Sequence, residues 1–146
     1  MNMPRGIRLR NPGNIDKSGT PWLGKVAGTD PRFETFDTMI HGVRALYMNL
    51  MHHIIHGEHT IPQLVSAWAP PNENNTQAYI DEVCRVTGYL VDQPIEPTFE
   101  MLGPIARAIT IQENGHTPDG GEWIGPEIFR QAWEEVAPMA TLIKKG

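Results

Sequence analysis

The sequence predicts a mainly α-helical protein with a small β element, folded as a single domain over residues 1–146. Three observations support this fold class. From position 39 onward, apolar residues recur at spacings of three and four, which is typical of amphipathic helices. Residues 1–36 are instead rich in Gly, Pro, Asn and Asp, which favour turns. The length of 146 residues and the 40% hydrophobic content suit one hydrophobic core.

The first elements follow from these patterns. We expect turns and a small β-hairpin around residues 22–36. A long helix follows, with Asp37 or Thr38 as its cap and Gly57 as its end. Its apolar stripe consists of Met39, Val43, Leu46, Leu50 and Ile54. A short helix is expected over residues 60–68, where Ala-Pro-Pro ends it.

The second half of the chain is predicted to be helical with loops between the helices. One helix covers residues 76–87 and stops at Gly88. Thr98 caps the next segment, in which Pro104 either kinks the helix or starts a new one that runs to residue 113. A last helix is expected from Pro126 to about Val136.

Charge and composition exclude several classes of protein. The net charge is −5, although residues 1–44 are basic, and this acidic balance argues against broad nucleic-acid binding. No apolar run is long enough to span a bilayer, so we expect no stable membrane insertion. The basic start lacks the apolar stretch of a signal peptide. A single cysteine, Cys84, allows no internal disulfide.

The stretch IARAITIQENG places an acid, Glu113, in the last turn of an apolar helix, before an Asn-Gly stop. The negative end of the helix dipole and partial desolvation both raise the pKa of a carboxyl group. A general acid that works near neutral pH needs such a rise. Glu113 is therefore a candidate general acid, and a solvent-exposed residue beside a helix cap is the alternative.

Other candidate residues lie earlier in the chain. Asn14 follows the turn sequence Asn-Pro-Gly, and an Asn side chain that faces a cleft can bind amide or hydroxyl groups. Trp22 follows shortly after it. Asp30 and Glu34 are nearby carboxylates, for which ordinary loop solvation is the alternative.

Two further groups of residues carry possible chemistry. Trp68 is expected to be a core residue or a cleft wall, and it precedes a polar set at a helix start: Glu73, Asn74, Thr76 and Tyr79. Tyr79 falls one turn into that helix and could point its hydroxyl at a neighbouring acid. The other group is His52, His56 and His59, whose spacing is compatible with a metal site. Gly57 interrupts that helix face, so a solvated polar surface is the default.

Taken together, the strings RGIRLRNPGNI, WLG, RFETFDT, GVRAL, WAPPNENNTQAYI and AITIQENG resemble a family of small phage and prophage proteins. Members of that family are known as phage structural proteins or as peptidoglycan-degrading, lysozyme-like enzymes. The resemblance covers residues 5–115. The chain departs from the usual pattern at Leu9, Arg10 and Asp16, where Asn, Asn and a basic residue are common.

A second resemblance concerns mechanism. AITIQENG is similar to the Glu-Ser-Gly-like string that ends the catalytic helix of goose-type lysozymes and soluble lytic transglycosylases. Asn74, Thr76, Tyr79 and Ile80 resemble their later motif, whose Tyr lies near the acid. In those enzymes the acid helix comes first, whereas here it follows the Tyr motif. The resemblance therefore implies a circularly permuted lysozyme-like domain.

These resemblances imply a phage peptidoglycan glycosidase that cleaves the β-1,4 bond between N-acetylmuramic acid and N-acetylglucosamine without a cofactor. Glu113 would protonate the leaving oxygen. For a muramidase, Asp30 is the first choice and Glu34 the second choice for the carboxylate that assists water. A lytic transglycosylase would need neither. The expected substrate-binding residues are Asn14, Trp22, Asn74, Thr76 and Tyr79.

The expected partners are peptidoglycan glycan strands. The protein would be made in the host cytoplasm and would reach the cell wall through a holin pore, as an endolysin, or in the infecting virion. Two alternatives stay open at this point. One is a non-catalytic virion structural or glycan-binding module, and the other is a metal-dependent enzyme that uses His52, His56 and His59.

Overall fold

The computed structural model describes residues 3–70 and 75–145, and within these ranges it is mainly helical with one small antiparallel sheet. The predicted mainly α class with a small β element is therefore confirmed. The elements in chain order are α1 (Arg5–Arg8), β1 (Lys25–Val26), β2 (Thr35–Phe36), α2 (Met39–Ile55), α3 (Ile61–Trp68), α4 (Thr76–Thr87), α5 (Phe99–Asn114) and α6 (Pro126–Lys145).

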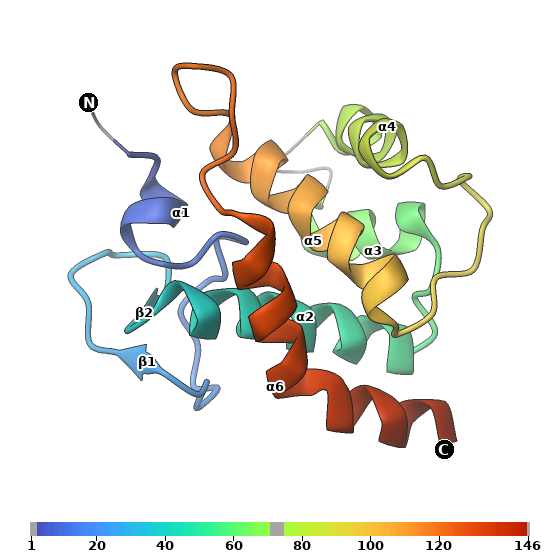
Figure 1. Ribbon diagram of the computed structural model, residues 1–146, viewed down its shortest axis with the longest axis horizontal. Helices are drawn as coiled ribbons and strands as arrows, with labels where there is room; N and C mark the ends of the chain where they lie inside the picture. The colour runs from blue at the N-terminus through green and yellow to red at the C-terminus, as the bar shows by residue number, and fades with distance from the viewer. Residues whose placement is uncertain (1–2, 71–74, 146) are drawn as a thin grey trace.

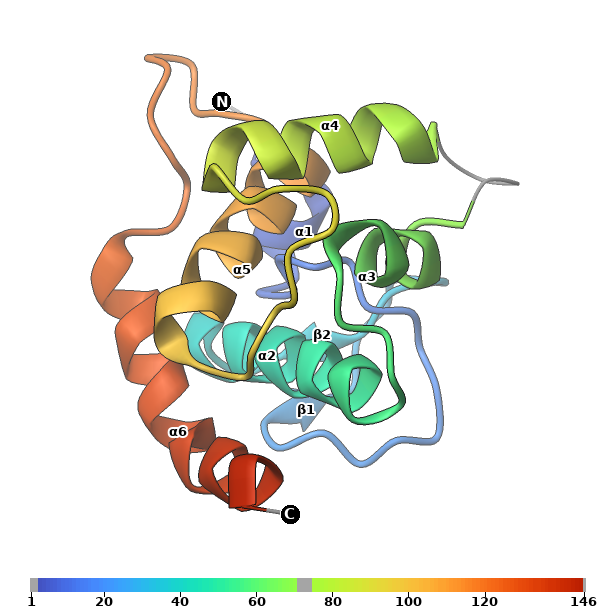
Figure 2. The ribbon, with the colours of Figure 1, turned by 90° about the vertical axis from the view of Figure 1, so that its right-hand side faces the viewer.

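Helix α5 occupies the middle of the molecule, and Figure 1 shows α6 and α2 on one side of it and α3 and α4 on the other. Figure 2 shows α4 lying across the top of α5, next to α3. The core forms where these helices meet, and its fully buried members include Leu46, Leu50, Val83, Leu102, Ala106 and Val136. The carboxyl end of α5 contacts α1 near the start of the chain, so segments that are far apart in the sequence contribute to one region.

The helix starts follow ordinary capping chemistry. The Thr38 hydroxyl accepts from the backbone N–H of His41 at 3.1 Å, so Thr38 is the cap of α2 and Asp37 instead pairs with the His41 ring. Thr60 and Gln63 form a reciprocal capping box on α3. Asn75 caps α4.

Pro104 lies inside one continuous helix, α5, so it neither ends a helix nor starts one. A proline lacks the N–H that would bond to the carbonyl four residues earlier. Here that carbonyl belongs to Glu100, and it accepts instead from the Tyr89 hydroxyl at 2.8 Å. This replacement keeps the backbone of α5 satisfied up to the turn that carries Glu113.

The amino-terminal third contains the expected hairpin, with Lys25 opposite Phe36 and Val26 opposite Thr35. The short helix α1 was not predicted, because four residues are too few to show a helical period. The segment after α1 lies against α2 so closely that a Cβ on Gly42 would come 1.8 Å from the Arg10 carbonyl oxygen. This contact requires glycine at position 42.

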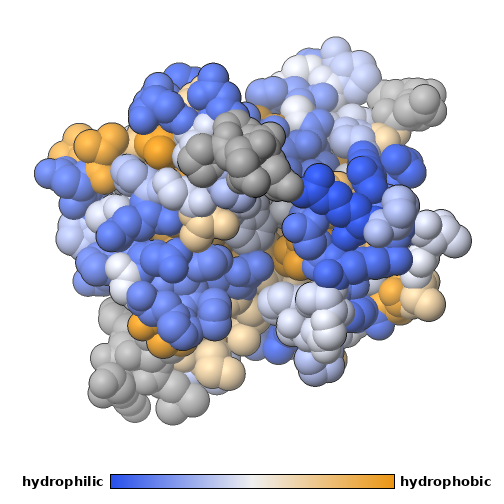
Figure 3. Space-filling view, turned by 180° about the vertical axis from the view of Figure 1, so that it is seen from behind, coloured by the Kyte–Doolittle hydropathy of each residue, from blue (hydrophilic) through white to orange (hydrophobic). Residues whose placement is uncertain are grey.

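Helix α6 was predicted to end near Val136 but continues to Lys145, through Pro138. Ala140, beyond the proline, is buried in the core, and this packing outweighs the local break. No helix in the described ranges combines the length and apolarity needed to cross a membrane. The face seen from behind is mostly hydrophilic with small, separate hydrophobic patches (Figure 3).

Candidate active site

Glu113 lies in the last turn of α5, partly buried, and each of its carboxylate oxygens accepts one hydrogen bond. The Asn14 side-chain amide donates to Oε1 at 2.8 Å. The Tyr79 hydroxyl donates to Oε2 at 3.0 Å. Three segments that are far apart in the sequence therefore meet at one carboxylate. The structure brings together three of the predicted site residues.

Tyr79 is 3% exposed and comes from the second turn of α4. Burial raises the pKa of its phenol well above the ordinary value, and the negative charge of Glu113 raises it further. Tyr79 therefore keeps its proton. A tyrosine hydroxyl can both donate and accept, whereas the amide nitrogen of Asn14 can only donate.

The loop that carries Asn14 is held by the fully buried side chain of Asn11. The Asn11 amide nitrogen donates to the carbonyl oxygens of Ile15 at 3.0 Å and Glu34 at 2.9 Å. Its side-chain oxygen accepts from the Ile15 N–H at 2.9 Å. Asn14 itself has a positive φ of 51°, which Asn tolerates better than most residues. The turn chemistry of NPGN thus aims the Asn14 amide at Glu113.

Asn114, next to Glu113, ties the same loop to helix α5. Its buried amide nitrogen donates to the Pro12 carbonyl and to the Thr110 carbonyl, both at 2.9 Å. Gly6 of α1 lies against this junction, where an added Cβ would come 2.6 Å from Asn114 Oδ1 and 2.7 Å from Asn14 Oδ1. The sequence predicted Asn114 only as part of a helix stop, so its bond to the loop was missed.

Glu113 borders a cavity of about 370 Å³. The wall includes an aromatic part, an aliphatic part and several polar side chains. Its described lining residues are Gly13, Asn14, Ile15, Asp16, Arg32, Phe33, Asn49, His53, Ala67, Trp68, Ala69, Pro70 and Glu113. Trp68 is thus a cavity wall, one of the two positions expected for it. Asn49 and His53 were not predicted as site residues, because both lie on a helix whose sequence pattern is dominated by its apolar stripe.

Thr76 acts on this wall indirectly. Its hydroxyl donates to the Ala69 carbonyl at 2.7 Å, which joins the start of α4 to the residue that follows α3. The helix cap is the neighbouring Asn75, whose side chain accepts from the Ala78 N–H. Asn74, expected to bind substrate, lies outside the described residues.

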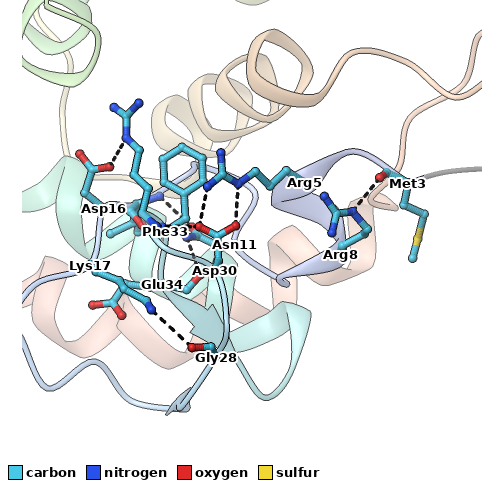
Figure 4. Close-up of polar contacts among 12 residues, drawn as sticks. Met3, Arg5, Arg8, Asn11, Asp16, Lys17, Gly28, Asp30, Phe33 and Glu34 are labelled. Atoms are coloured by element: carbon cyan, nitrogen blue, oxygen red, sulfur yellow. Dashed lines mark hydrogen bonds and ion pairs between the residues drawn. The ribbon is translucent and has the colours of Figure 1, made fainter.

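Asp30, the first choice for a second carboxylate, does not line the cavity but is held in a bidentate ion pair. Arg5 donates to it through Nε and Nη2, both at 2.6 Å, and Figure 4 shows these two contacts beside the Phe33 ring. The Arg5 guanidinium holds the pKa of Asp30 far below its usual range, and the backbone N–H groups of Phe33 and Arg32 lower it further. Asp30 therefore stays ionised and structural.

Glu34, the second choice, is also outside the described lining of the cavity. Its side chain is 2% exposed and pairs with Lys25 Nζ at 3.0 Å. The Ser18 N–H donates to the same carboxylate at 3.2 Å. The expectation of an ordinary solvated loop residue was wrong for Glu34, because the hairpin folds over it and supplies a cation.

Trp22 lies apart from Glu113. It packs against the small cluster of Ile15, Phe36 and Ala45 and lines a separate, open depression on the hairpin. The aromatic side chains that line the Glu113 cavity are instead Phe33 and Trp68.

The three histidines of the metal alternative do not converge. The His52 and His56 rings lie 4.3 Å apart, and a ring N–H of His56 donates to the His52 carbonyl at 2.7 Å. The helix ends at Ile55, before His59 can join that face. In the part of the chain that the structure describes, no three His, Cys, Asp or Glu side chains form a group that could hold a metal ion.

The comparisons with known proteins identify a phage relative. No protein-family model matches the chain. Protein P5 of Pseudoalteromonas phage PM2 is 34% identical to it over 119 residues, which cover 78% of this chain and 73% of Protein P5. The expected kinship with phage proteins is therefore confirmed, and the chain belongs to the family of Protein P5 of Pseudoalteromonas phage PM2.

Proposed function

We propose that this protein is a phage peptidoglycan glycosidase that cleaves the β-1,4 bond between N-acetylmuramic acid and N-acetylglucosamine, with Glu113 as the general acid. One observation carries the proposal. A carboxyl group at the end of a buried helix borders a cavity of about 370 Å³ and is held through both oxygens by side chains from distant segments. Such fixed geometry is what general acid catalysis requires.

The hydrogen bonds favour one position for the proton. Asn14 can only donate its amide hydrogen, so Oε1 has to stay an acceptor. Oε2 faces the Tyr79 hydroxyl, which is able to turn and accept. We therefore place the acidic proton on Oε2, from which it passes to the glycosidic oxygen as the bond to the sugar breaks.

The rest of the cavity suits a carbohydrate. Phe33 and Trp68 offer aromatic surface for the apolar faces of sugar rings, and Asn49 and His53 offer polar groups for hydroxyl and amide substituents. After Glu113 has protonated the leaving oxygen, hydrolysis by water would make the enzyme a muramidase, and attack by the 6-hydroxyl of the muramic acid would make it a lytic transglycosylase. Neither reaction needs a cofactor.

The wider setting is part of the same proposal. The relationship to goose-type lysozymes and lytic transglycosylases would require a circular permutation, because Tyr79 precedes Glu113 in this chain. The substrate would be peptidoglycan glycan strands in the cell wall. The protein would reach them as an endolysin released through a holin pore or as a lysin carried in the virion, and a phage origin agrees with its relationship to a phage protein.

A non-catalytic glycan-binding module of the virion is the second candidate. The observation that favours it is that both carboxylate oxygens of Glu113 already have donors, so its hydrogen bonds are satisfied without a substrate and the group can serve as a purely structural element. Such a module would use the same cavity to bind glycan without cleaving it.

A zymogram on purified peptidoglycan, run together with a pelleting assay, separates the two candidates. The glycosidase is expected to clear the gel, and Glu113→Gln is expected to bind peptidoglycan like the wild type without clearing. Folded wild-type protein that pellets with peptidoglycan and never clears it would favour the binding module. Clearing by Glu113→Gln at the wild-type rate would refute the role of Glu113.

A further inference from the structure

We propose that Asp16, rather than Asp30 or Glu34, is the second carboxylate of this site and activates the water that completes hydrolysis. This inference rests on the proposed glycosidase function and goes beyond it, because it makes the enzyme a muramidase. Asp16 is the acidic residue that shares the described cavity wall with Glu113.

The position of Asp16 follows from the loop that holds Asn14. Ile15, between the two, is 7% exposed and packs with Phe36 and Ala45 in a small apolar cluster. Asn14 and Asp16, the two neighbours of Ile15 in the chain, both line the cavity. Asp16 also forms a β-bridge with Phe33, which fixes its backbone.

The spacing suits a water between two carboxyl groups. Two residues of chain reach at most roughly 7 Å, so the Asp16 backbone lies within that distance of the Asn14 backbone. The Asn14 side chain bonds to Glu113 at 2.8 Å, and Asp16 and Glu113 line the same cavity. Enzymes that invert the configuration of the sugar hold their two carboxyl groups about 6.5–9.5 Å apart to admit the attacking water.

The surroundings of Asp16 differ from those of the other two acids. Its side chain is 65% exposed, so water reaches it, whereas Asp30 and Glu34 are 11% and 2% exposed. Arg32 Nε pairs with Asp16 Oδ1 at 2.9 Å, and Arg32 Cζ lies 5.1 Å from the centre of the Phe33 ring. This pair restrains the Asp16 carboxylate, and both of its residues line the cavity.

The proposed step balances as follows. Glu113 gives its proton to the oxygen of the leaving N-acetylglucosamine while the bond from that oxygen to the anomeric carbon breaks. A water forms the new bond to the anomeric carbon and gives one proton to Asp16. Glu113 ends as a carboxylate and Asp16 as a carboxylic acid, and exchange with solvent restores both. The product carries one added water.

The test is mass spectrometry of the muropeptides that wild type and Asp16→Asn release from purified peptidoglycan. Wild type is expected to release hydrated products. Asp16→Asn should release them at least about 100-fold more slowly, because an amide cannot accept the proton. Asp92→Asn, which neutralises an exposed acid in the turn between α4 and α5, is the matched control and should keep the wild-type rate.

Azide gives a second readout that a merely structural role would not produce. It attacks without losing a proton, so it should restore bond cleavage in Asp16→Asn and yield a glycosyl azide, but it should not rescue Glu113→Gln to the same extent. Thermal unfolding of each variant checks that the fold is kept.

The outcomes separate the role of Asp16 from the proposed glycosidase function. Anhydro products alone from the wild type would overturn the role of Asp16 and leave the glycosidase proposal standing. Hydrated products from Asp16→Asn at the wild-type rate would do the same. Folded wild-type protein that releases no product at all would overturn the proposed function, and the role of Asp16 with it.

Discussion

Replacing Gly6 with alanine tests the junction that holds the candidate acid in place. Gly6 lies in α1, so helix propensity alone predicts that alanine would stabilise the protein by about 1 kcal/mol. The structure predicts the opposite result. An added Cβ would come 2.6 Å from Asn114 Oδ1, 2.7 Å from Asn14 Oδ1 and 2.8 Å from the Asn11 carbonyl oxygen.

These three oxygens have little freedom to move. The amides of Asn14 and Asn114 are held by hydrogen bonds to Glu113 and to backbone carbonyls, and the third oxygen belongs to the backbone. Overpacking of this kind costs about 1–3 kcal/mol, and three contacts at once place Gly6→Ala near the upper end. After the gain in helix propensity, the free energy of unfolding should fall by about 2 kcal/mol.

The rate of peptidoglycan cleavage should fall as well. The Cβ pushes Asn14 away from Glu113, and a hydrogen bond to a charged group contributes about 1.5–3 kcal/mol. The rate of peptidoglycan cleavage should then fall by about 10- to 100-fold. Urea unfolding and a turbidity assay on cell walls measure the two effects.

The matched control is Gly19→Ala, because an added Cβ there meets nothing within 4 Å. Gly19→Ala should leave both the unfolding free energy and the cleavage rate close to wild type. A Gly6→Ala protein that is as stable and as active as the wild type would refute the packing described for this junction.

Three further predictions concern single contacts. Tyr79→Phe removes one donor to the candidate acid and should lower the cleavage rate about 10- to 100-fold with little loss of folded protein, measured by steady-state kinetics and circular dichroism. Tyr89→Phe leaves the Glu100 carbonyl without its donor and should lower the unfolding free energy by about 1 kcal/mol while activity stays unchanged. Arg107 lowers the pKa of Glu122 by its hydrogen bonds and its charge. The ion pair therefore stabilises the folded protein at pH values above the ordinary pKa of a glutamate. This stabilisation is lost as the pH falls through the lowered pKa of Glu122. Glu122→Gln should therefore be less stable than wild type by under about 1 kcal/mol near neutral pH, and the difference should vanish in acid; a difference that grows in acid would contradict the pairing.

Local patterns were sufficient for much of the fold. Helix caps act over three or four residues, so Thr38, Thr60 and Thr98 marked their helix starts correctly. The short helix α1 was missed because four residues show no period. Helix α6 was predicted to end near Val136, but it continues to Lys145, and Ala140 beyond Pro138 is buried in the core. Tertiary packing is not visible in a window of a few residues.

In the candidate site, too, the residues with a local sequence signal were predicted and those that depend on long-range contacts were not. The residue types and the order of the strings placed Asn14, Tyr79 and Glu113 in one proposed site, and the structure brings these three into contact. Asp30 and Glu34, expected as second carboxylates, lie outside the described lining of the cavity and pair with cations from elsewhere in the chain, and no short pattern shows which acid such a cation will pair with.

Most of the cavity wall could not be predicted for a similar reason. Asn49 and His53 are four residues apart on one face of α2, but only the folding of the hairpin against α2 brings Phe33 to the same cavity. The Asn114 bond to the Pro12 carbonyl is likewise a long-range contact, made by a residue that the sequence marked only as part of a stop signal.

The most direct test of the central claim is the rate at which wild type and Glu113→Gln release sugar reducing ends and muropeptides from purified peptidoglycan. Gln keeps the size of Glu and can still bond to the Tyr79 hydroxyl, but it cannot give up a proton. The account predicts cleavage by the wild type and a loss of at least about 100-fold in the folded variant. Equal rates for the two proteins would contradict it.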